Sequence, residues 1–204
     1  MTEPGYFDGL YAGKDDPWDL SGSPYERRKL DVLMASLPRP RYRDAFEPGC
    51  AIGVTTCALA KRCDRLLAMD GAASAVAQTR SRLAGVAPHV RVIQGRLPDD
   101  WPDGSFDLIV LSELLYYLDA ASRRQIADRI RSTAAADADV MVVHWRHPFT
   151  EATTTGDQAH RELTAGLRDA GFRRLVHHVE DDFQLQVHRA SAEASIEGTS
   201  AEAR

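Results

Sequence analysis

A glycine-rich turn and an acidic residue stand at the ends of two neighbouring strands that the sequence predicts. The turn runs from Glu47 to Gly53, E-P-G-C-A-I-G, and the next apolar stretch ends at Asp70. Gly49 and Gly53 let the backbone turn sharply and approach a ligand closely, and the helix that follows offers free N–H groups at its start. About 20 residues beyond such a turn, a carboxylate can accept hydrogen bonds from both hydroxyls of a ribose. These residues therefore indicate a nucleoside site.

The spacing within the turn bears on which nucleoside would bind. No third glycine follows Gly49 and Gly53, as it does in the dinucleotide fingerprint G-x-G-x-x-G. Glu47, the first residue of the turn and the one before its glycines, would be unfavourable beside a pyrophosphate and favourable beside an ammonium or sulfonium group. The turn, with Cys50 inside it, therefore favours S-adenosylmethionine, and it disfavours the alternative of an NAD-dependent oxidoreductase.

Further polar and aromatic residues follow the later strands. His144 ends the fifth expected strand and is the best candidate for a general base, because the ordinary pKa of histidine lies near neutral pH. Glu113, just past the fourth strand, is the second candidate for contacting the acceptor or accepting a proton. The alternatives are a structural histidine in the core and an acidic residue that favours a helix N-terminus. The other residues expected on this rim are Ser112 beside the cofactor and Tyr117, Trp145 and Arg146 beside the acceptor.

Residues 1–41 form an irregular, aromatic segment that leads into a helix starting at Tyr25. We expect a lid and a helix here, because a lid excludes water from a reacting centre. Trp18 or Tyr25 would face a sulfonium through a cation–π contact of about 0.5–2 kcal/mol. Arg28 would hold a methionine carboxylate with its planar fork. The alternative is a packed helix whose basic face is solvated.

These residues need a sheet that brings them together. Apolar stretches alternate with helical patterns from Tyr42 to Trp145, a rhythm typical of βαβ units and a mainly parallel sheet. Ligands of such a sheet bind beyond the carboxyl ends of its strands. The expected strands are 42–46, 65–69, 90–94, 106–111 and 139–145, and the expected helices are 25–37, 54–62, 72–83, 122–134 and 157–170. Residues 173–180 and 182–189 predict an antiparallel hairpin at the sheet edge.

The chain thus divides into residues 1–41, one α/β domain over residues 42–189, and a tail over residues 190–204. The tail has one large apolar residue, Ile196, and we expect it to be disordered, because such a segment cannot bury enough surface to order itself.

The composition is ordinary for a globular protein. Of the 204 residues, 44% are apolar and 27% are charged, and the formal net charge of -5 argues against a general nucleic-acid binder. No stretch approaches the roughly 20 apolar residues of a membrane helix, and the first residues lack the basic start of a secretory signal. The three cysteines include no C-x-x-C pair. We therefore expect a protein of the reducing cytoplasm.

Three segments, E-P-G-C-A-I-G, R-L-L-A-M-D and S-E-L-L-Y-Y-L, together resemble the class I S-adenosylmethionine-dependent methyltransferases. The upstream S-P-Y-E-R-R-K and the downstream V-V-H-W-R-H-P resemble more specifically the nodulation protein S group, whose namesake N-methylates an amino sugar on a chito-oligosaccharide. The resemblance runs from about Tyr6 to Arg189. It implies a Rossmann-like methyltransferase fold, a mostly parallel seven-stranded sheet ending in an antiparallel hairpin, with S-adenosyl-L-methionine as the cofactor.

One position departs from the class I pattern. These enzymes commonly have an acidic residue just after the third strand, where it holds the adenine amino group. This chain has Q-G-R-L-P at that place. We therefore expect the backbone near Arg96 and Leu97 to contact the adenine.

The sequence thus predicts a methyltransferase that acts on a small molecule, with N-methylation of an amino sugar or another small amine as the favoured reaction. A small-molecule O-methyltransferase and a non-catalytic S-adenosylmethionine-binding protein remain the alternatives. No metal site is predicted, since His144, His147 and His160 match no ligand spacing. The oligomeric state is left open.

Overall fold

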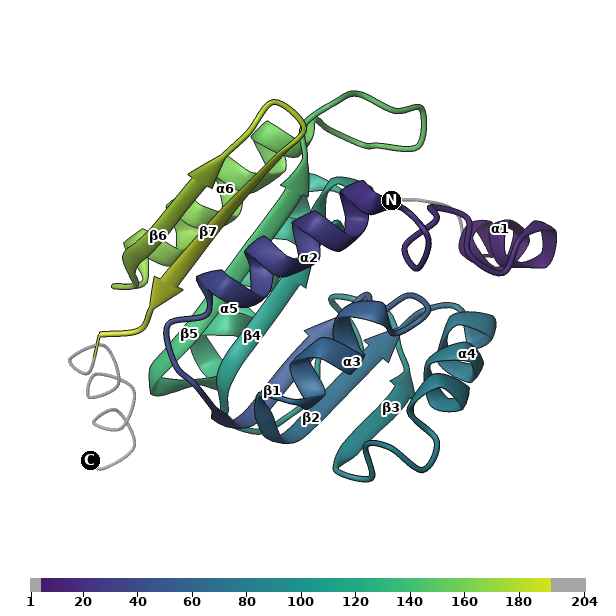
Figure 1. The fold of residues 1–204 in the computed structure, drawn as a ribbon. Coiled ribbons are helices and arrows are strands. Elements are labelled where there is room, and N and C mark those ends of the chain that lie inside the picture. Colours follow the sequence, from purple (N-terminus) through teal and green to yellow (C-terminus); the bar gives the residue numbers. More distant parts are fainter. Residues whose placement is uncertain (1–4, 192–204) are drawn as a thin grey trace.

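A twisted sheet of seven strands runs through the molecule in the order β3-β2-β1-β4-β5-β7-β6 (Figure 1). The computed structural model describes residues 5–191. The strands are β1 (Tyr42–Pro48), β2 (Cys63–Asp70), β3 (Val90–Gln94), β4 (Phe106–Ser112), β5 (Ala134–Trp145), β6 (Arg173–Val179) and β7 (Phe183–Arg189). Strand β7 is antiparallel to β5 and to β6, and every other pair is parallel. The predicted fold class, including the C-terminal hairpin, is confirmed.

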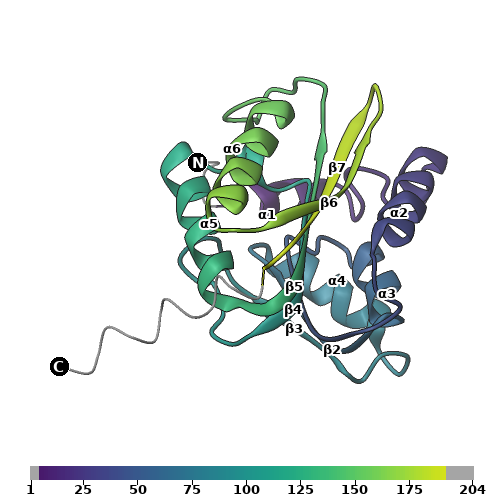
Figure 2. The ribbon, with the colours of Figure 1, turned by 90° about the vertical axis from the view of Figure 1, so that its left-hand side faces the viewer.

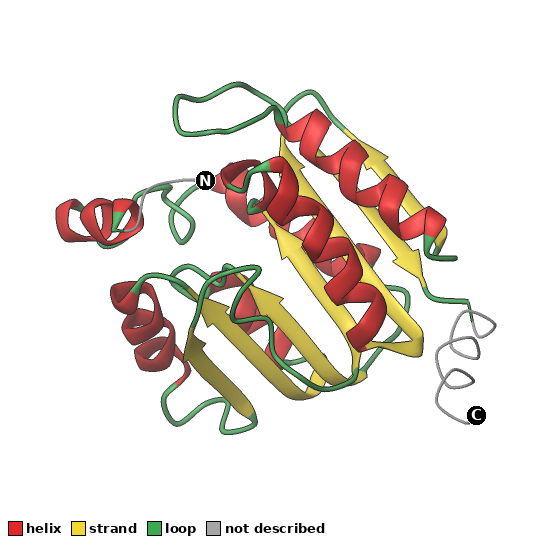
Figure 3. Ribbon diagram, turned by 180° about the vertical axis from the view of Figure 1, so that it is seen from behind, coloured by secondary structure: helices red, strands yellow, loops and turns green. Residues whose placement is uncertain are grey.

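Helices cover both faces of this sheet. Figure 2 shows α2, α3 and α4 on one side of the strands and α5 and α6 on the other, and Figure 3 shows α5 and α6 lying across the second face. The helices are α1 (Tyr6–Gly13), α2 (Pro24–Ser36), α3 (Val54–Ala60), α4 (Ala73–Leu83), α5 (Ala120–Thr133) and α6 (Gly156–Asp169), with a 3₁₀ turn, η1, at Leu115–Tyr117.

The two helical layers account for the apolar character of the central strands. One core cluster lies under α2 and α3 and includes Leu33, Leu59 and Leu108. The other lies under α5 and α6 and includes Ile126 and Leu163. Because helices pack on both faces, the first six residues of β4 are all buried, which is the pattern expected of a covered parallel strand. Burying each large aliphatic side chain contributes about 1.5–3 kcal/mol.

Side-chain caps fix where three of the helices begin. The hydroxyl of Ser23 accepts from the backbone N–H of Glu26, and Pro24 takes the first position of α2, where its missing N–H does no harm. Asp119 caps α5 and Thr155 caps α6 in the same way. All three caps lie at the end of the molecule where the parallel strands finish.

Helix α1 and the start of strand β5 differ most from the sequence prediction. Helix α1 lies in the segment expected to be irregular. Strand β5 begins at Ala134 rather than 139, because Ala134 pairs with Phe106 at the start of β4. Alanine favours helices, and pairing with a neighbouring strand overrides that preference here. The predicted disorder of the tail concerns residues that, from 192 on, lie outside the described part of the chain.

The strand order places a crevice at the carboxyl ends of the central strands. From β1 the chain first builds outward through β2 and β3, and it then returns to add β4 and β5 on the other side of β1. Such a reversal leaves a crevice beyond the carboxyl ends of β1 and β4, where ligands of α/β sheets bind. Within residues 5–191, no helix has the length and apolar character needed to cross a membrane.

Candidate active site

A cavity of about 830 Å³ lies at the carboxyl ends of β1, β2 and β4, with residues of α1 and α2 forming its outer wall. Acidic side chains outnumber basic ones in its lining. The acidic residues are Asp8, Asp19, Glu26, Glu47, Asp70, Asp99, Glu113 and Glu151, and the basic ones are Lys29 and Arg96. A cavity with this excess of negative charge attracts cationic ligands.

The glycine turn after β1 is held close to the end of β2. The backbone N–H of Gly49 donates to the Met69 carbonyl at 2.7 Å. Gly49 has φ of 73°, Ala51 of 48° and Gly53 of 80°, so three residues of the turn are left-handed. A Cβ on Gly53 would lie 2.8 Å from Thr79. Glycine is therefore required at Gly53 both for its backbone angle and for space.

Asp70 is fixed between the turn and the start of α4. Its Oδ2 accepts from the N–H of Ala51 and its Oδ1 accepts from the N–H of Ala72, each at 2.9 Å. Burial raises the pKa of Asp70, and these backbone N–H groups partly offset that rise. Each oxygen retains a lone pair for a ligand. The carboxylate thus lines the cavity in a set orientation, as the sequence predicted for a group that binds ribose.

Glu47 is a buried carboxyl group in the cavity, with the Thr56 hydroxyl nearby as the group that lowers its pKa. Only 3% of the residue is exposed, and within the described residues its Oε2 has no hydrogen-bond partner. Burial raises the pKa of Glu47 to about 8. Burying a carboxylate without a partner is unfavourable, so an ammonium or sulfonium group beside Glu47 would supply what the protein leaves out. The residues present therefore fit S-adenosylmethionine.

Glu113 lies at the end of β4 with a φ of 56° and is held by three donors. The Nζ of Lys29 reaches Oε1 at 2.9 Å, while the Tyr116 hydroxyl and the Trp145 backbone N–H both reach Oε2 at 2.7 Å. These bonds leave little of the carboxylate open to a ligand. Glu113 is at the predicted place, but it acts there as an anchor for its neighbours.

Two residues of α2 belong to the site and were not predicted. Glu26 and Lys29 line the cavity, and Lys29 bonds to Glu26 at 3.0 Å as well as to Glu113. Burial lowers the pKa of Lys29, but the two carboxylates outweigh burial and raise it. The sequence holds a signal for both: they precede the buried Leu33 by seven and four residues, which is the spacing of one helix face.

Aromatic rings close the cavity. Tyr25 meets Trp145 edge to face, with ring centroids 5.3 Å apart, and Phe7 of α1 meets Tyr117 in the same way at 5.0 Å. Within the described residues the buried Tyr25 hydroxyl has no hydrogen-bond partner. Trp18 also lines the cavity. The predicted placement of Trp18, Tyr25, Tyr117 and Trp145 at the site therefore agrees with the structure.

The remaining predicted cofactor residues also lie on the cavity wall. Cys50, Arg96, Leu97 and Ser112 all line it. The backbone N–H of Arg96, however, donates to the Asp100 carboxylate at 2.8 Å. That donor is therefore already used within the protein, which weighs against the expected contact from this N–H to adenine.

The structure does not bring His144 to the cavity. His144 is fully buried on the opposite side of β5, where its Nδ1 lies 3.1 Å from Nδ1 of His160. Burial lowers the pKa of both histidines, as does the charge of Arg123 for His144. A base must reach the proton that it removes. The prediction of His144 as the general base is therefore corrected: it is a core histidine.

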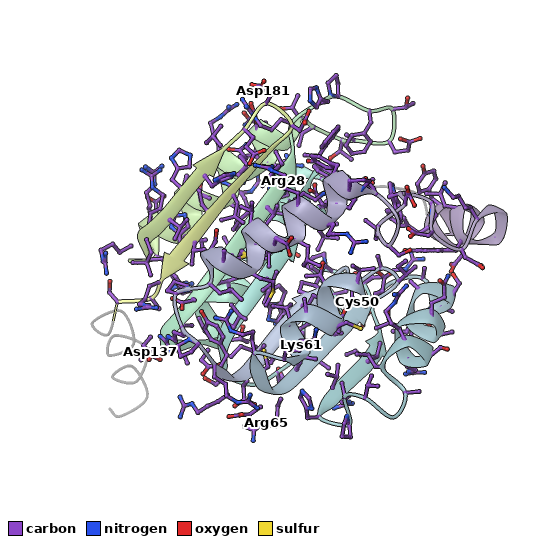
Figure 4. All side chains as sticks on the ribbon, in the orientation of Figure 1. Arg28, Cys50, Lys61, Arg65, Asp137 and Asp181 are labelled. Atoms are coloured by element: carbon purple, nitrogen blue, oxygen red, sulfur yellow. The ribbon has the colours of Figure 1, made fainter. Side chains whose placement is uncertain are left out.

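Two predicted arginines also lie elsewhere. Figure 4 shows Arg28 on α2 beside the β6–β7 hairpin, whose loop carries Asp181. The guanidinium of Arg28 bonds to Glu180 in that loop at 2.6 Å and lies outside the cavity. Arg146 bonds to Asp157 at 3.0 Å and is likewise absent from the cavity wall. Both side chains form ion pairs outside the cavity. The structure therefore does not support the predicted contact of Arg28 with the cofactor carboxylate or that of Arg146 with the acceptor. In the described part of the chain, no group of three His, Cys, Asp or Glu side chains is arranged to hold a metal ion.

The sheet order and the cavity at its carboxyl edge define the Rossmann-like class of nucleoside-binding folds on which class I methyltransferases are built. The profile of the family described as Nodulation protein S (NodS) matches residues 11–149, and the chain belongs to this family. The resemblance stated from the sequence is thus confirmed.

Individual relatives agree with this assignment. The chain is 37% identical to nodulation protein S of Rhizobium tropici over 114 residues, which is 55% of this chain and 48% of that protein. It is 36% identical to that of Sinorhizobium fredii over 123 residues, 59% of this chain and 56% of that protein. The matched segment therefore spans about half the length of the curated relatives.

Solved structures match over more of the chain. A crystal structure from Pseudomonas syringae, of a protein classed with the methyltransferases, has a TM-score of 0.71 and 43% identity, covering 81% of this chain and 98% of that one. The N-methyltransferase NodS from Bradyrhizobium japonicum WM9, in complex with S-adenosyl-L-homocysteine, has a TM-score of 0.76 and 24% identity, covering 92% and 99%. The latter likeness shows the fold.

Proposed function

We propose that this protein is an S-adenosylmethionine-dependent methyltransferase that transfers a methyl group to the amine of a small molecule, of the amino-sugar class. The observation that carries the proposal is the buried carboxylate of Glu47, whose Oε2 has no hydrogen-bond partner among the described residues, in an acidic cavity that Asp70 also lines. The relatives support it, since the B. japonicum protein is an N-methyltransferase that binds S-adenosyl-L-homocysteine. The bound cofactor would supply an electrophilic methyl group, and the protein would bind and align the reactants.

In this proposal each part of the cavity has its own task. Asp70 orients the ribose, and the left-handed turn around Gly49 lets the nucleoside approach the backbone closely. Glu47 faces the cationic end of the cofactor. The part of the cavity beyond β4, lined by Glu26 and Trp145, then remains for the acceptor. Holding two reactants in near-attack geometry can supply about 7–11 kcal/mol of the barrier.

In the same proposal, residues 5–41, the described part of the N-terminal segment, form the lid and helix that the sequence predicted. Phe7 of α1 contacts Tyr117 on the far side of the cavity, and Gln78 of α4 donates to the Asp15 carbonyl at 3.0 Å. These contacts hold the segment over the crevice, where it would keep water from the reacting atoms.

Two measurements test the proposed function. Calorimetry with S-adenosyl-L-homocysteine should give saturable binding to one site. Methyl-labelled S-adenosylmethionine, offered with a panel of amino sugars and small amines and a matched panel of hydroxyl compounds, should label an amine. Binding without transfer to either panel would indicate a non-catalytic binding protein. Transfer to hydroxyls alone would indicate an O-methyltransferase, and absence of binding would overturn the proposal.

A further inference from the structure

Glu26 stands where a helix cap is expected but does not serve as one. Ser23 and Glu26 have the S-x-x-E spacing of a capping box, in which the glutamate side chain reaches back to the N–H of the first residue. Here the Ser23 N–H donates instead to the Asp19 carbonyl at 3.0 Å. The backbone therefore satisfies the donor that Glu26 would otherwise bind, and the Glu26 side chain lines the cavity.

The surroundings of Glu26 make its carboxylate available to a cation. Its side chain is 17% exposed, and within residues 5–191 Lys29 is the one side chain that donates to it. Lys29 is in turn shared with Glu113. One ammonium thus faces two carboxylates, which leaves this end of the cavity with a negative charge that a second ammonium could neutralise.

We propose that Glu26 is the carboxylate that binds the amine of the acceptor and takes its proton, with Lys29 and Glu113 as positioning residues. This inference rests on the proposed function. The acceptor ammonium gives one proton to Glu26 and keeps the lone pair on nitrogen. That lone pair forms the new N–C bond while the S–C bond breaks and leaves its electron pair on sulfur. Charge and atoms balance without a further reactant.

Glu26 suits this role better than the two residues predicted from the sequence. His144 lies on the other side of β5, and the carboxylate of Glu113 is occupied by three donors. Burial raises the pKa of Glu26, as does the nearby charge of Glu113, although Lys29 opposes the rise. A raised pKa brings a carboxyl group closer to the range in which it can exchange protons near neutral pH.

The matched pair of variants is Glu26→Gln and Asp31→Asn. Both remove one negative charge from α2, but Asp31 is exposed and absent from the cavity wall. Glutamine keeps the size of Glu26 and its hydrogen bond to Lys29, so a purely structural role would survive the change. Glu26→Asp, which keeps the charge, provides the rescue. Thermal unfolding and S-adenosyl-L-homocysteine affinity establish that each variant is folded.

Two readouts decide the outcome. The first readout is calorimetry with S-adenosyl-L-homocysteine bound. Glu26→Gln should weaken the binding of glucosamine at least fivefold and leave the binding of N-acetylglucosamine, which has no basic amine, unchanged. Glu26→Gln should also lower kcat by about 10²–10⁴-fold and remove the acid limb of the pH–rate profile, while Asp31→Asn behaves as the parent and Glu26→Asp recovers part of the rate.

The failures of the two proposals are distinguishable. If the unaltered protein binds no S-adenosyl-L-homocysteine or methylates no amine, the proposed function is wrong. If the unaltered protein methylates an amine and Glu26→Gln keeps the same kcat and the same pH–rate profile, the function stands and the role of Glu26 is wrong.

Discussion

Single carboxylates set the chemistry of the cavity, and each does so through a different environment. Asp70 is oriented by two backbone N–H groups, Glu113 is occupied by three donors, and Glu47 has an oxygen with no donor among the described residues. All three are carboxylates, so the chemistry of the side chain alone does not separate them. The difference lies in which backbone and side-chain groups the fold places around each one.

Replacing Asp70 should weaken nucleoside binding. Asp70→Ala would leave the ribose hydroxyls and two backbone N–H groups without their acceptor, and we expect S-adenosyl-L-homocysteine to lose about 1–3 kcal/mol of binding free energy. Calorimetry provides the measurement. Asp64→Ala, which removes a carboxylate from the other, exposed end of β2, is the control and should bind normally. An unchanged affinity in Asp70→Ala would exclude the ribose contact.

Glu47 should couple ligand binding to proton release. Because the pKa of Glu47 is raised to about 8, the group is mostly protonated at pH 7 in the free protein. An ammonium placed beside it favours the charged form and lowers that pKa, so binding releases a proton and tightens as the pH rises from 7 to 8. Calorimetry at pH 7 in buffers of different ionisation enthalpy measures the release. Glu47→Gln should abolish it, and equal release by both proteins would contradict this account.

At the scale of elements, a histidine pair joins β5 to α6. His144 of β5 and His160 of α6 share one hydrogen bond between their Nδ1 atoms, so one ring must donate and the other accept. Within the described residues both Nε2 atoms lack a partner. Arg123 and Asp157 act on His144, and His177 and His188 act on His160. Burial and this shared bond favour two neutral rings.

The pair should make the fold sensitive to acid. Folding lowers the pKa of both histidines, so below about pH 6.5 the unfolded chain binds protons that the folded chain does not. The free energy of unfolding is therefore insensitive to these groups above that pH. Below it, the free energy falls by up to about 1.4 kcal/mol per pH unit for each histidine.

Urea unfolding at pH 7 and pH 5 measures this dependence. The double variant His144→Leu/His160→Leu removes both groups and should lessen the loss of stability at pH 5. An equal loss in the parent and the double variant would show that other groups cause it.

The order of elements was largely predictable from the sequence, and the reason is periodicity. Strands such as Leu108–Leu111 are apolar throughout because helices cover both faces, and helices such as 157–170 carry an apolar stripe that ends at Gly171. Helix α1 was not predictable in this way. Its side chains pack on the neighbouring α4 and on rings from η1, and such long-range contacts leave no local period.

The residues of the candidate site also fall into those that the sequence predicted and those that it did not. Residues fixed by the local turn or strand end, such as Glu47, Gly53 and Asp70, were placed correctly because backbone direction follows from the strand–turn–helix order. His144 and Arg28 were misplaced because strands and helices have two faces, and the sequence did not indicate which face each side chain occupies. Glu26 and Lys29 were missed because charged helix residues usually face solvent.

At the scale of the whole molecule, the cavity is enclosed by two parts of the chain. The ends of the sheet strands form its floor, and the N-terminal segment forms its outer wall. Glu26 and Lys29 reach the cavity from one side of the sheet, and Phe7 reaches Tyr117 over its opening. Helix α2 of this segment packs into the core, whereas the part before α2 contacts the rest of the chain through a small cluster of side chains and the bond from Gln78 to Asp15. Parts with few buried contacts open more readily than the core.

Ligand binding should therefore slow hydrogen exchange in the N-terminal segment. We expect amide protons of residues 5–22, which precede α2, to gain protection when S-adenosyl-L-homocysteine binds, because a ligand that contacts this part disfavours its open forms. Mass spectrometry of peptides from the free and bound protein measures the change. Peptides from α6, which is packed on the opposite face of the sheet, serve as the internal control. Protection confined to the strand ends would argue against a lid.

The first residue of α6 carries a final consequence for the variation that this chain can tolerate. A Cβ at Gly156 would lie 1.8 Å from the carbonyl oxygen of Trp145, which is far shorter than a non-bonded contact. Even alanine at this position would therefore force the start of α6 away from the end of β5. Trp145 also forms part of the cavity wall. In a library that samples all twenty amino acids at codon 156, selection for a folded and active product should return glycine almost alone.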